Sequence, residues 1–189
     1  MQDTCTLSEQ TKQYLSRFYD ILDNMIHNMT SADLTDSISH NFIVQMIPHH
    51  RAAIEMSENV LPLLGRGPLR RIADRIITEQ TKSIADMENA LPPCSCSCSP
   101  ELDRELYQRR MDLIYQTMFS QMGNAPETNR VAVNFMREMI PHHEGAIRMA
   151  KNALKYGVCP ELVPILCAII VSQEKGVREM KALLRRCGC

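Results

Sequence analysis

The feature that most constrains this chain is a stretch of sequence that it contains twice. Residues 41–61 read NFIVQMIPHHRAAIEMSENVL and residues 134–154 read NFMREMIPHHEGAIRMAKNAL, so twelve of the 21 positions are identical without a gap. The offset is 93 residues, and it also relates Gln80 to Gln173 outside the stretch. Repetition at a fixed offset indicates a structural unit that occurs twice. We therefore interpret the chain as a tandem duplication with two pseudo-symmetric halves.

Each half is predicted to contain three helices, because apolar residues recur at three- and four-residue spacing. In the first half the expected helices cover residues 8–29, a segment from about 36–39 to 61, and residues 69–91, and the second half repeats this plan. No stretch shows the two-residue alternation of a strand. We expect an all-α protein in which two helix pairs form a four-helix bundle and two leading helices pack outside.

The expected domain organisation follows the repeat. Residues 1–93 form the first unit, residues 94–100 a cysteine-rich linker, and residues 101–189 the second unit. Pro92 and Pro93 predict that the third helix ends near Leu91, because proline interrupts helical hydrogen bonding. A chain of 189 residues can bury most of its apolar surface, so we expect the two units to form one compact body.

Composition excludes several classes of partner. The net charge of -1 leaves no basic field for phosphates, so we expect no nucleic acid partner. The longest apolar run, residues 162–171, is interrupted by Pro164 and is about half as long as a membrane span. The first residues lack the charged and apolar regions of a secretory signal. A cytosolic protein, a virion protein and a mature secreted segment all remain open.

Four residues of the repeated stretch predict a metal site. Met46, His49, His50 and Met56 share one broad helix face, and Pro48 should bend the helix immediately before the histidines. The second half has the same spacing in Met139, His142, His143 and Met149. Met87 and Met180, on the next helix of each half, are weaker candidates for additional thioether ligands.

Thioether sulfur combined with imidazole favours copper(I), with silver or zinc as alternatives. The Glu-x-x-His pattern of di-iron bundles and the His-Glu-x-x-His pattern of zinc proteases are both missing. Packing is the competing interpretation, because methionine often fills cores. Adjacent histidines on a helix also diverge by about 100°, so at most one of each pair aims straight at a shared point. One shared site and two separate sites both remain open.

The segments MIPHHRAAIEM and MIPHHEGAIRM, each followed by a helix with the pattern Ile-Ile-x-x-Gln-(x)6-Met, resemble a known family. This family is catalogued as domain of unknown function number 305, in the ferritin-like superfamily. The resemblance covers residues from about 38 to 91 and from 131 to 184. It implies a ferritin-like four-helix bundle built from two similar helix pairs. Many members are secreted bacterial proteins, some are linked to copper binding and resistance, and some are encoded by large DNA viruses of algae.

The resemblance carries the family's histidine pair and flanking methionines onto the eight residues named above. The chain departs from the family pattern at one position of the helix that follows the histidines. Family members usually have an acidic residue three positions after the glutamine of this helix. Ser83 and Gly176 stand there instead. The cysteine segments and the leading helices also lie outside the common pattern.

The cysteines have two interpretations. Cys-x-Cys spacing on flexible segments suits thiolate binding of copper(I) or zinc, whereas disulfides between linker, tail and N-terminus would stabilise the fold. The residues concerned are Cys5, Cys94, Cys96, Cys98, Cys187 and Cys189. Cys159 and Cys167 have no cysteine at the repeat offset, and we expect them to be core residues.

The residues thus predict a protein that sequesters or transfers a soft metal ion. We expect no enzyme, because no nucleophile with a paired base, no phosphate-binding glycine loop and no carboxylate pair is readable. The alternative is a structural or interaction module, such as a virion component, that keeps the bundle without an essential metal. In that case the partner would be an assembly component or a second copy in a homo-oligomer.

Overall fold

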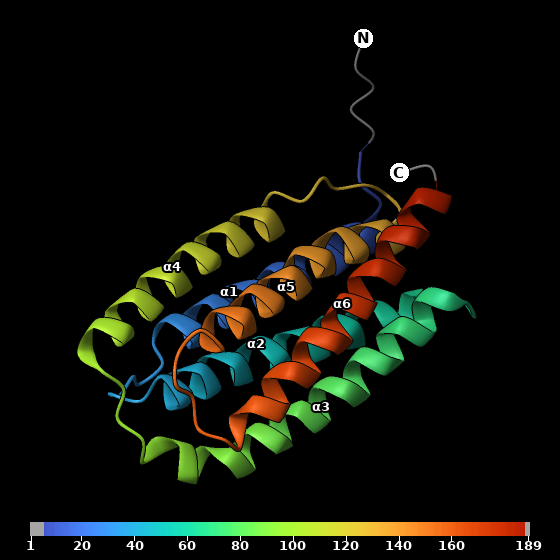
Figure 1. Cartoon of the computed structure of the whole chain (residues 1–189). Helices are drawn as coiled ribbons and strands as arrows, with labels where there is room; N and C mark the ends of the chain where they lie inside the picture. The colour runs from blue at the N-terminus through green and yellow to red at the C-terminus, as the bar shows by residue number, and fades with distance from the viewer. Residues whose placement is uncertain (1–5, 188–189) are drawn as a thin grey trace.

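The computed structural model describes residues 6–187, and within this range the chain forms six α-helices and one short 3-10 turn (Figure 1). Cys5 and Cys189 lie outside the described residues. The helices are α1 (Glu9–Thr30), α2 (Ile38–Val60), α3 (Pro68–Ser95), α4 (Glu101–Gly123), α5 (Val131–Ala153) and α6 (Leu162–Arg186), with the 3-10 turn at Leu61–Leu63.

The helices pack in three layers of two. Helices α2 and α5 form the middle layer, with α1 and α4 on one side and α3 and α6 on the other (Figure 1). Helices α2, α3, α5 and α6 contact one another as a four-helix bundle, and α1 and α4 cover its remaining face. The expectation of an all-α bundle with the leading helices outside is therefore confirmed. None of the described helices is long and apolar enough to cross a membrane.

The sequence of the two middle helices explains why they are buried. Apolar or small residues cover most of the circumference of α2, and in α5 they cover all but one strip with Arg137, Glu144 and Arg148. Both helices are therefore largely buried. Gly145 on α5 also permits close packing, because a Cβ atom there would lie 2.1 Å from Met118 Sδ on α4. The histidines stand in the middle of these two helices and are thereby carried into the centre of the protein.

The same polar contacts hold the helices in both halves. Asn41 exchanges two hydrogen bonds with the backbone of Thr35, and Asn134 does the same with Thr128. Further along, Asn59 Nδ2 donates to the carbonyl oxygen of Tyr14 at 3.1 Å, and the equivalent Asn152 donates to that of Tyr107 at 3.2 Å. These buried or partly buried bonds fix the entry of each middle helix and its packing against the leading helix.

The end of α3 differs from the prediction. The helix continues through Pro92 and Pro93 to Ser95 instead of ending near Leu91. Ser95 Oγ donates to the carbonyl oxygen of Leu91, and the N–H of the C-cap residue Cys96 donates to that of Pro93. The residues predicted to begin the linker therefore form the last turn of α3.

The cysteines agree with the predictions only in part. Cys94 forms a disulfide with Cys159, which joins the end of α3 to the connection between α5 and α6. A disulfide was one of the two interpretations of Cys94, but its partner lies outside the linker, tail and N-terminus that we expected. Cys159 is buried in the core, as expected. Cys167, also expected in the core, is exposed on α6. Cys96, Cys98 and Cys187 are exposed as well, and Cys98 Sγ donates to Asp36.

Candidate metal centre

The histidines meet where α2 crosses α5. The rings of His49 and His142 stack with their centroids 3.6 Å apart, and all four histidine side chains are buried. His50 turns toward α3, where its Nε2 lies 3.1 Å from Ser83 Oγ. His143 turns toward α6 and packs against Gly176, where a Cβ atom would lie 2.7 Å from the ring. One histidine of each pair thus faces its counterpart, and the other faces the outer layer.

A hydrogen bond determines the tautomer of His142. Its Nε2 lies 3.0 Å from the carbonyl oxygen of His49. A carbonyl oxygen can only accept, so Nε2 carries the proton and the lone pair of His142 is on Nδ1. A bond of this kind, made through the second ring nitrogen, is how proteins commonly orient a metal-binding imidazole.

Several ring nitrogens in the centre have no hydrogen-bond partner. Both nitrogens of His49 are buried and unpaired, and so is the Nδ1 atom of His50, His142 and His143. Buried polar atoms are nearly always paired, because leaving one unpaired costs about 1–3 kcal/mol. These buried nitrogens are therefore available to accept a hydrogen bond or to coordinate a bound group.

Burial keeps these imidazoles neutral. It lowers the pKa of His50 to about 3, with nearby His142 adding to the effect, and lowers that of His142 to about 4. The pKa values of His49 and His143 are likewise well below 6.5, again because burial disfavours the charged ring. Only the neutral ring offers a lone pair, so the histidines are in their metal-binding form at neutral pH.

The methionines of the predicted site are all buried in the same core: Met46, Met56, Met87, Met139, Met149 and Met180. The contact of His50 with Ser83 fixes the register of α2 against α3, which run in opposite directions (Figure 1). Met46 precedes His50 by four residues and Met87 follows Ser83 by four, so the two methionines lie at one level. In the second half, the contact of His143 with Gly176 places Met139 and Met180 at one level in the same way. Met56 and Met149 lie seven residues from His49 and His142, about 10 Å along the helix.

The structure does not bring the four histidines together as ligands of one ion. Among residues 6–187, the one group of three His, Cys, Asp or Glu donor atoms that lie within 4.8 Å of one another is Cys94, Cys159 and Glu161. The two sulfurs of that group form the disulfide and are not thiolates. Imidazole lone pairs lie in the ring plane, so the stacked rings of His49 and His142 point along separate planes rather than at one point.

Other polar residues of the centre were missed by the sequence analysis. Gln80 and Gln173 are buried on α3 and α6, and the Oε1 atom of each has no partner. Their identity at the repeat offset was the signal that could have found them. On the opposite side of α5, Tyr14 Oη donates to the buried carboxyl group of Glu138, and burial raises the pKa of Glu138 to about 8. The equivalent of Glu138 in the first half is Gln45, so the repeat gave no signal for this acid.

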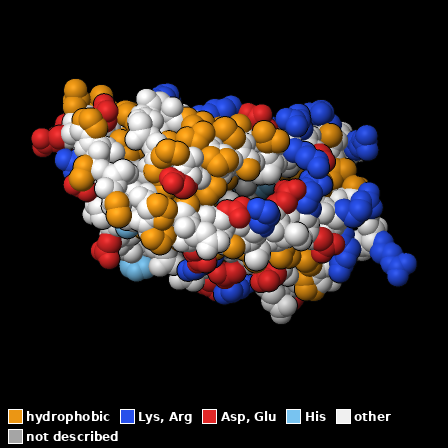
Figure 2. Space-filling model, turned by 60° about the horizontal axis from the view of Figure 1, so that its bottom comes forward, with side chains coloured by type: hydrophobic (Ala, Val, Ile, Leu, Met, Phe, Trp, Pro, Cys, Tyr) orange, Lys and Arg blue, Asp and Glu red, His pale blue; other side chains and the backbone are white. Residues whose placement is uncertain are grey.

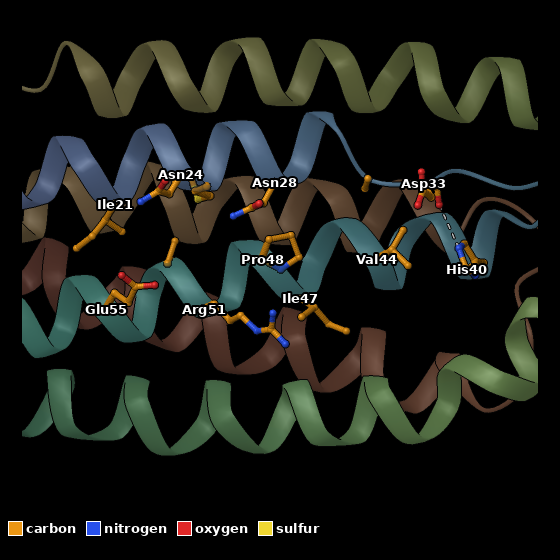
Figure 3. Close-up of a pocket in the computed structure, with 13 residues that line it drawn as sticks. Ile21, Asn24, Asn28, Asp33, His40, Val44, Ile47, Pro48, Arg51 and Glu55 are labelled. Carbon is orange, nitrogen blue, oxygen red and sulfur yellow. Dashed lines mark hydrogen bonds between the residues drawn. The ribbon is translucent and has the colours of Figure 1, made fainter.

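The prolines inside α2 and α5 border surface grooves rather than the buried histidine rings. A groove of about 540 Å³ lies between α1 and α2 over Ile47 and Pro48, with Asn24 and Asn28 of α1 on its wall (Figure 3). A groove of about 520 Å³ lies over the equivalent Ile140 and Pro141. The four buried histidines are absent from both linings. The centre is therefore enclosed by the bundle.

The comparisons with known proteins agree with this architecture. A crystal structure of a DUF305 fragment from Deinococcus radiodurans has a TM-score of 0.57 at 24% identity, covering 79% of this chain and 96% of the fragment. A structure of CopM in the silver-bound form, obtained by soaking, has a TM-score of 0.58 at 27% identity, covering 82% of this chain and 98% of CopM. No curated protein sequence matches the chain.

The family comparison extends over most of the chain. The model described as Domain of unknown function (DUF305) matches residues 20–91 and residues 39–184, which include both histidine helices and the helices that follow them. The twice-occurring MIPHH stretch, the helical bundle and this match lead to one conclusion. The chain belongs to the DUF305 family.

Proposed function

We propose that this protein binds soft monovalent metal ions, copper(I) or silver, in the core around α2 and α5. The observation that carries the proposal is the set of unpaired, neutral imidazole nitrogens in a core rich in methionine. Imidazole and thioether donors together select soft ions such as copper(I). CopM, a structural neighbour at 27% identity, has been obtained in a silver-bound form.

The proposed ligands fall into two equivalent groups. In the first half, Met46 and Met87 lie at one level near His49 and His50, and in the second half Met139 and Met180 have the same relation to His142 and His143. Met56 and Met149 are more distant along the helices, and we assign them a smaller contribution. Bound there, an ion would occupy the lone pairs that the protein leaves unpaired. The protein would sequester or transfer the ion.

Competition for copper(I) tests the proposal. The apoprotein is titrated with copper(I) in the presence of the chromogenic chelator bicinchoninate, and we expect it to withdraw the metal at micromolar concentration. Replacing Met46 and Met139 by leucine removes two sulfurs at nearly constant volume. We expect this double variant to bind copper(I) at least about tenfold more weakly.

The repeat supplies a matched control for this experiment. Met29 and Met122 are related by the same offset, are equally buried, and lie on the outer helices α1 and α4. Leucine at both positions should leave copper(I) affinity unchanged. Equal affinity of both double variants and the wild type would contradict the assignment of the sulfurs, and a wild type that withdraws no copper(I) would refute the proposed function.

The pH dependence adds a second readout. Protons compete with a metal for imidazole only below the pKa of the ring. Burial lowers the pKa of His142 to about 4, so copper(I) affinity should persist when the pH falls below 6.5, the ordinary value for histidine. A site built from exposed histidines would instead weaken below pH 6.5. The chelator competition, repeated in buffers on either side of this value, distinguishes the two.

A further inference from the structure

The outer face of α6 is apolar although it faces solvent. Val163 is 39% exposed and Val171 is 68% exposed, and the thiol of Cys167 lies midway between them on the exposed face. Pro164 and Ala168 are exposed beside them, and we call these five residues the α6 surface. In Figure 2, hydrophobic side chains gather on the part of the molecule that the first half of α6 forms. Contiguous exposed apolar surface of this kind marks interaction sites.

The fold itself does not require this surface, because the repeat supplies an internal control. Helix α3 holds the equivalent place in the first half, yet its residues at the offset are polar. Arg70 stands where α6 has Val163, Asp74 where it has Cys167, and Thr78 where it has Val171. Arg71 and Arg75 replace Pro164 and Ala168 in the same way. Helix packing in this architecture is thus compatible with a charged outer face, and the apolar face of α6 has another cause.

We propose that a second copy of this chain docks on the α6 surface, with the two α6 helices antiparallel about Cys167. Val163 and Val171 each lie four residues from Cys167, so all three share one face of the helix. The spacing is therefore symmetric about Cys167 along the helix. An antiparallel copy therefore brings each Val163 to the partner's Val171 and Cys167 to the partner's Cys167. A surface that matches itself under a two-fold rotation is what a symmetric dimer requires.

The charges at the ends of the stripe favour the same orientation. Glu161 lies just before the α6 surface and Lys175 just after it, and both are exposed. Neither takes part in an ion pair within residues 6–187. In an antiparallel pair each Glu161 approaches the level of the partner's Lys175, whereas a parallel pair would place like charges at the same level. Opposite charges at the two ends thus specify the antiparallel arrangement.

A second exposed apolar stripe, on α4, provides the comparison surface. Leu102, Leu106 and Leu113 are exposed there, and α1 has Glu9, Gln13 and Asp20 at the equivalent positions. Their spacing of four and seven residues is not symmetric about a centre, so the stripe does not match an antiparallel copy of itself. We therefore place the dimer contact on α6.

Sedimentation equilibrium of the full chain tests the proposal, with bicinchoninate present to remove copper(I). Over a wide concentration range the wild type should pass from the 21.6 kDa monomer to twice that mass. The variant V163R/V171T, which takes the residues of α3, should dimerise at least about tenfold more weakly. The control variant L102E/L106Q/L113D, which takes the residues of α1, should dimerise like the wild type. Thermal melting shows that each variant is folded.

Cross-linking gives the orientation. A short bis-maleimide reagent should join the two Cys167 thiols and yield a covalent dimer. The variant C167S should lose this product, and C96S/C98S should keep it. A wild type that stays monomeric at every concentration overturns the proposal, as does a dimer that only the α4 variant weakens. Cross-linking that survives C167S also overturns it. Co-sedimentation of a monomeric wild type with phosphatidylglycerol vesicles would assign the α6 surface to a membrane interface instead.

Discussion

The two halves of this protein share a packing frame but differ in the polar groups at its centre. His50 has a hydroxyl partner in Ser83, whereas its equivalent His143 packs against Gly176, which offers no side chain. Gln45 of the first half is replaced by Glu138, which accepts a hydrogen bond from Tyr14. The ion pair of Arg51 with Glu88 recurs with reversed charges as Glu144 with Lys181.

Comparing the halves separates the residues that the fold requires from the residues that can differ between two copies of the same fold. The helix-entry asparagines, the middle-layer histidines and the buried methionines occur in both halves with the same partners or positions. The groups that differ lie around the histidines and on the outer faces. Each half thus supplies the substitutions with which the other half can be tested. The following predictions use this relation.

Among substitutions compared at one pH, the largest loss of stability should come from the disulfide, which occurs once. Replacing Cys94 and Cys159 by serine opens a bridge between residues separated by 65 positions, and bridges of this span contribute about 2–4 kcal/mol to the free energy of unfolding. Denaturant unfolding without reductant measures the loss. The exposed pair Cys96 and Cys98, also changed to serine, is the control and should leave stability unchanged. Equal stability of the Cys94/Cys159 variant and the wild type would contradict a structural role for the bridge.

Glu138 should make stability depend on pH. Its pKa rises from 4.5 to about 8 in the folded protein, so between these values the unfolded chain releases a proton that the folded chain retains. The stabilisation is complete below pH 4.5 and is lost as the pH rises toward 8, by up to about 1.4 kcal/mol per pH unit. In E138Q, which takes the residue of the first half, this slope should vanish.

The comparison of E138Q with the wild type isolates the carboxyl group. The buried histidines lower stability in the other direction, as the pH falls below 6.5, and both proteins share this effect. The difference between their unfolding free energies should therefore change only through Glu138. A constant difference from pH 5 to pH 8 would show that the carboxyl group titrates at its ordinary pKa.

Substitutions of the residues that contact His50 and His143 should have an intermediate effect on the free energy of unfolding. Gly176→Ser makes the second half resemble the first, but its Cβ atom would lie 2.7 Å from the His143 ring, and we expect a loss of about 1–3 kcal/mol from overpacking. Ser83→Ala removes the hydrogen bond to His50 and should cost about 1 kcal/mol. Chemical unfolding of both variants gives the ranking. A more costly Ser83→Ala would show that the hydroxyl contact outweighs the close packing.

Reversing a surface ion pair should have the smallest effect. The double variant R51E/E88K gives the first half the charge order of the second, and both side chains are more than half exposed. Exposed pairs contribute about 0–1 kcal/mol, so the double variant should match the wild type within about 0.5 kcal/mol. The single variant R51E places a glutamate opposite Glu88, so it should be slightly less stable than both the wild type and the double variant. A large loss in the double variant would indicate contacts beyond the ion pair.

The repeat made much of the fold predictable. Helix periodicity and a fixed offset located six helices and placed the histidine pairs on two of them, because the spacing of apolar residues indicates which face of a helix is buried. The partner of Cys94 could not be predicted in this way, since Cys159 has no cysteine at the offset. The stacking of His49 on His142 depends on how the two halves meet, which spacing within one half does not specify. Glu138 was missed for the related reason that it breaks the repeat.

The bridge between Cys94 and Cys159 has a consequence for proteolysis. The whole of α4 and α5 lies inside the covalent ring that it closes. A protease that cuts the 124–130 connection once would open this ring without releasing a fragment. The nicked chain would migrate as one species on a denaturing gel without reductant and separate into two pieces only after reduction.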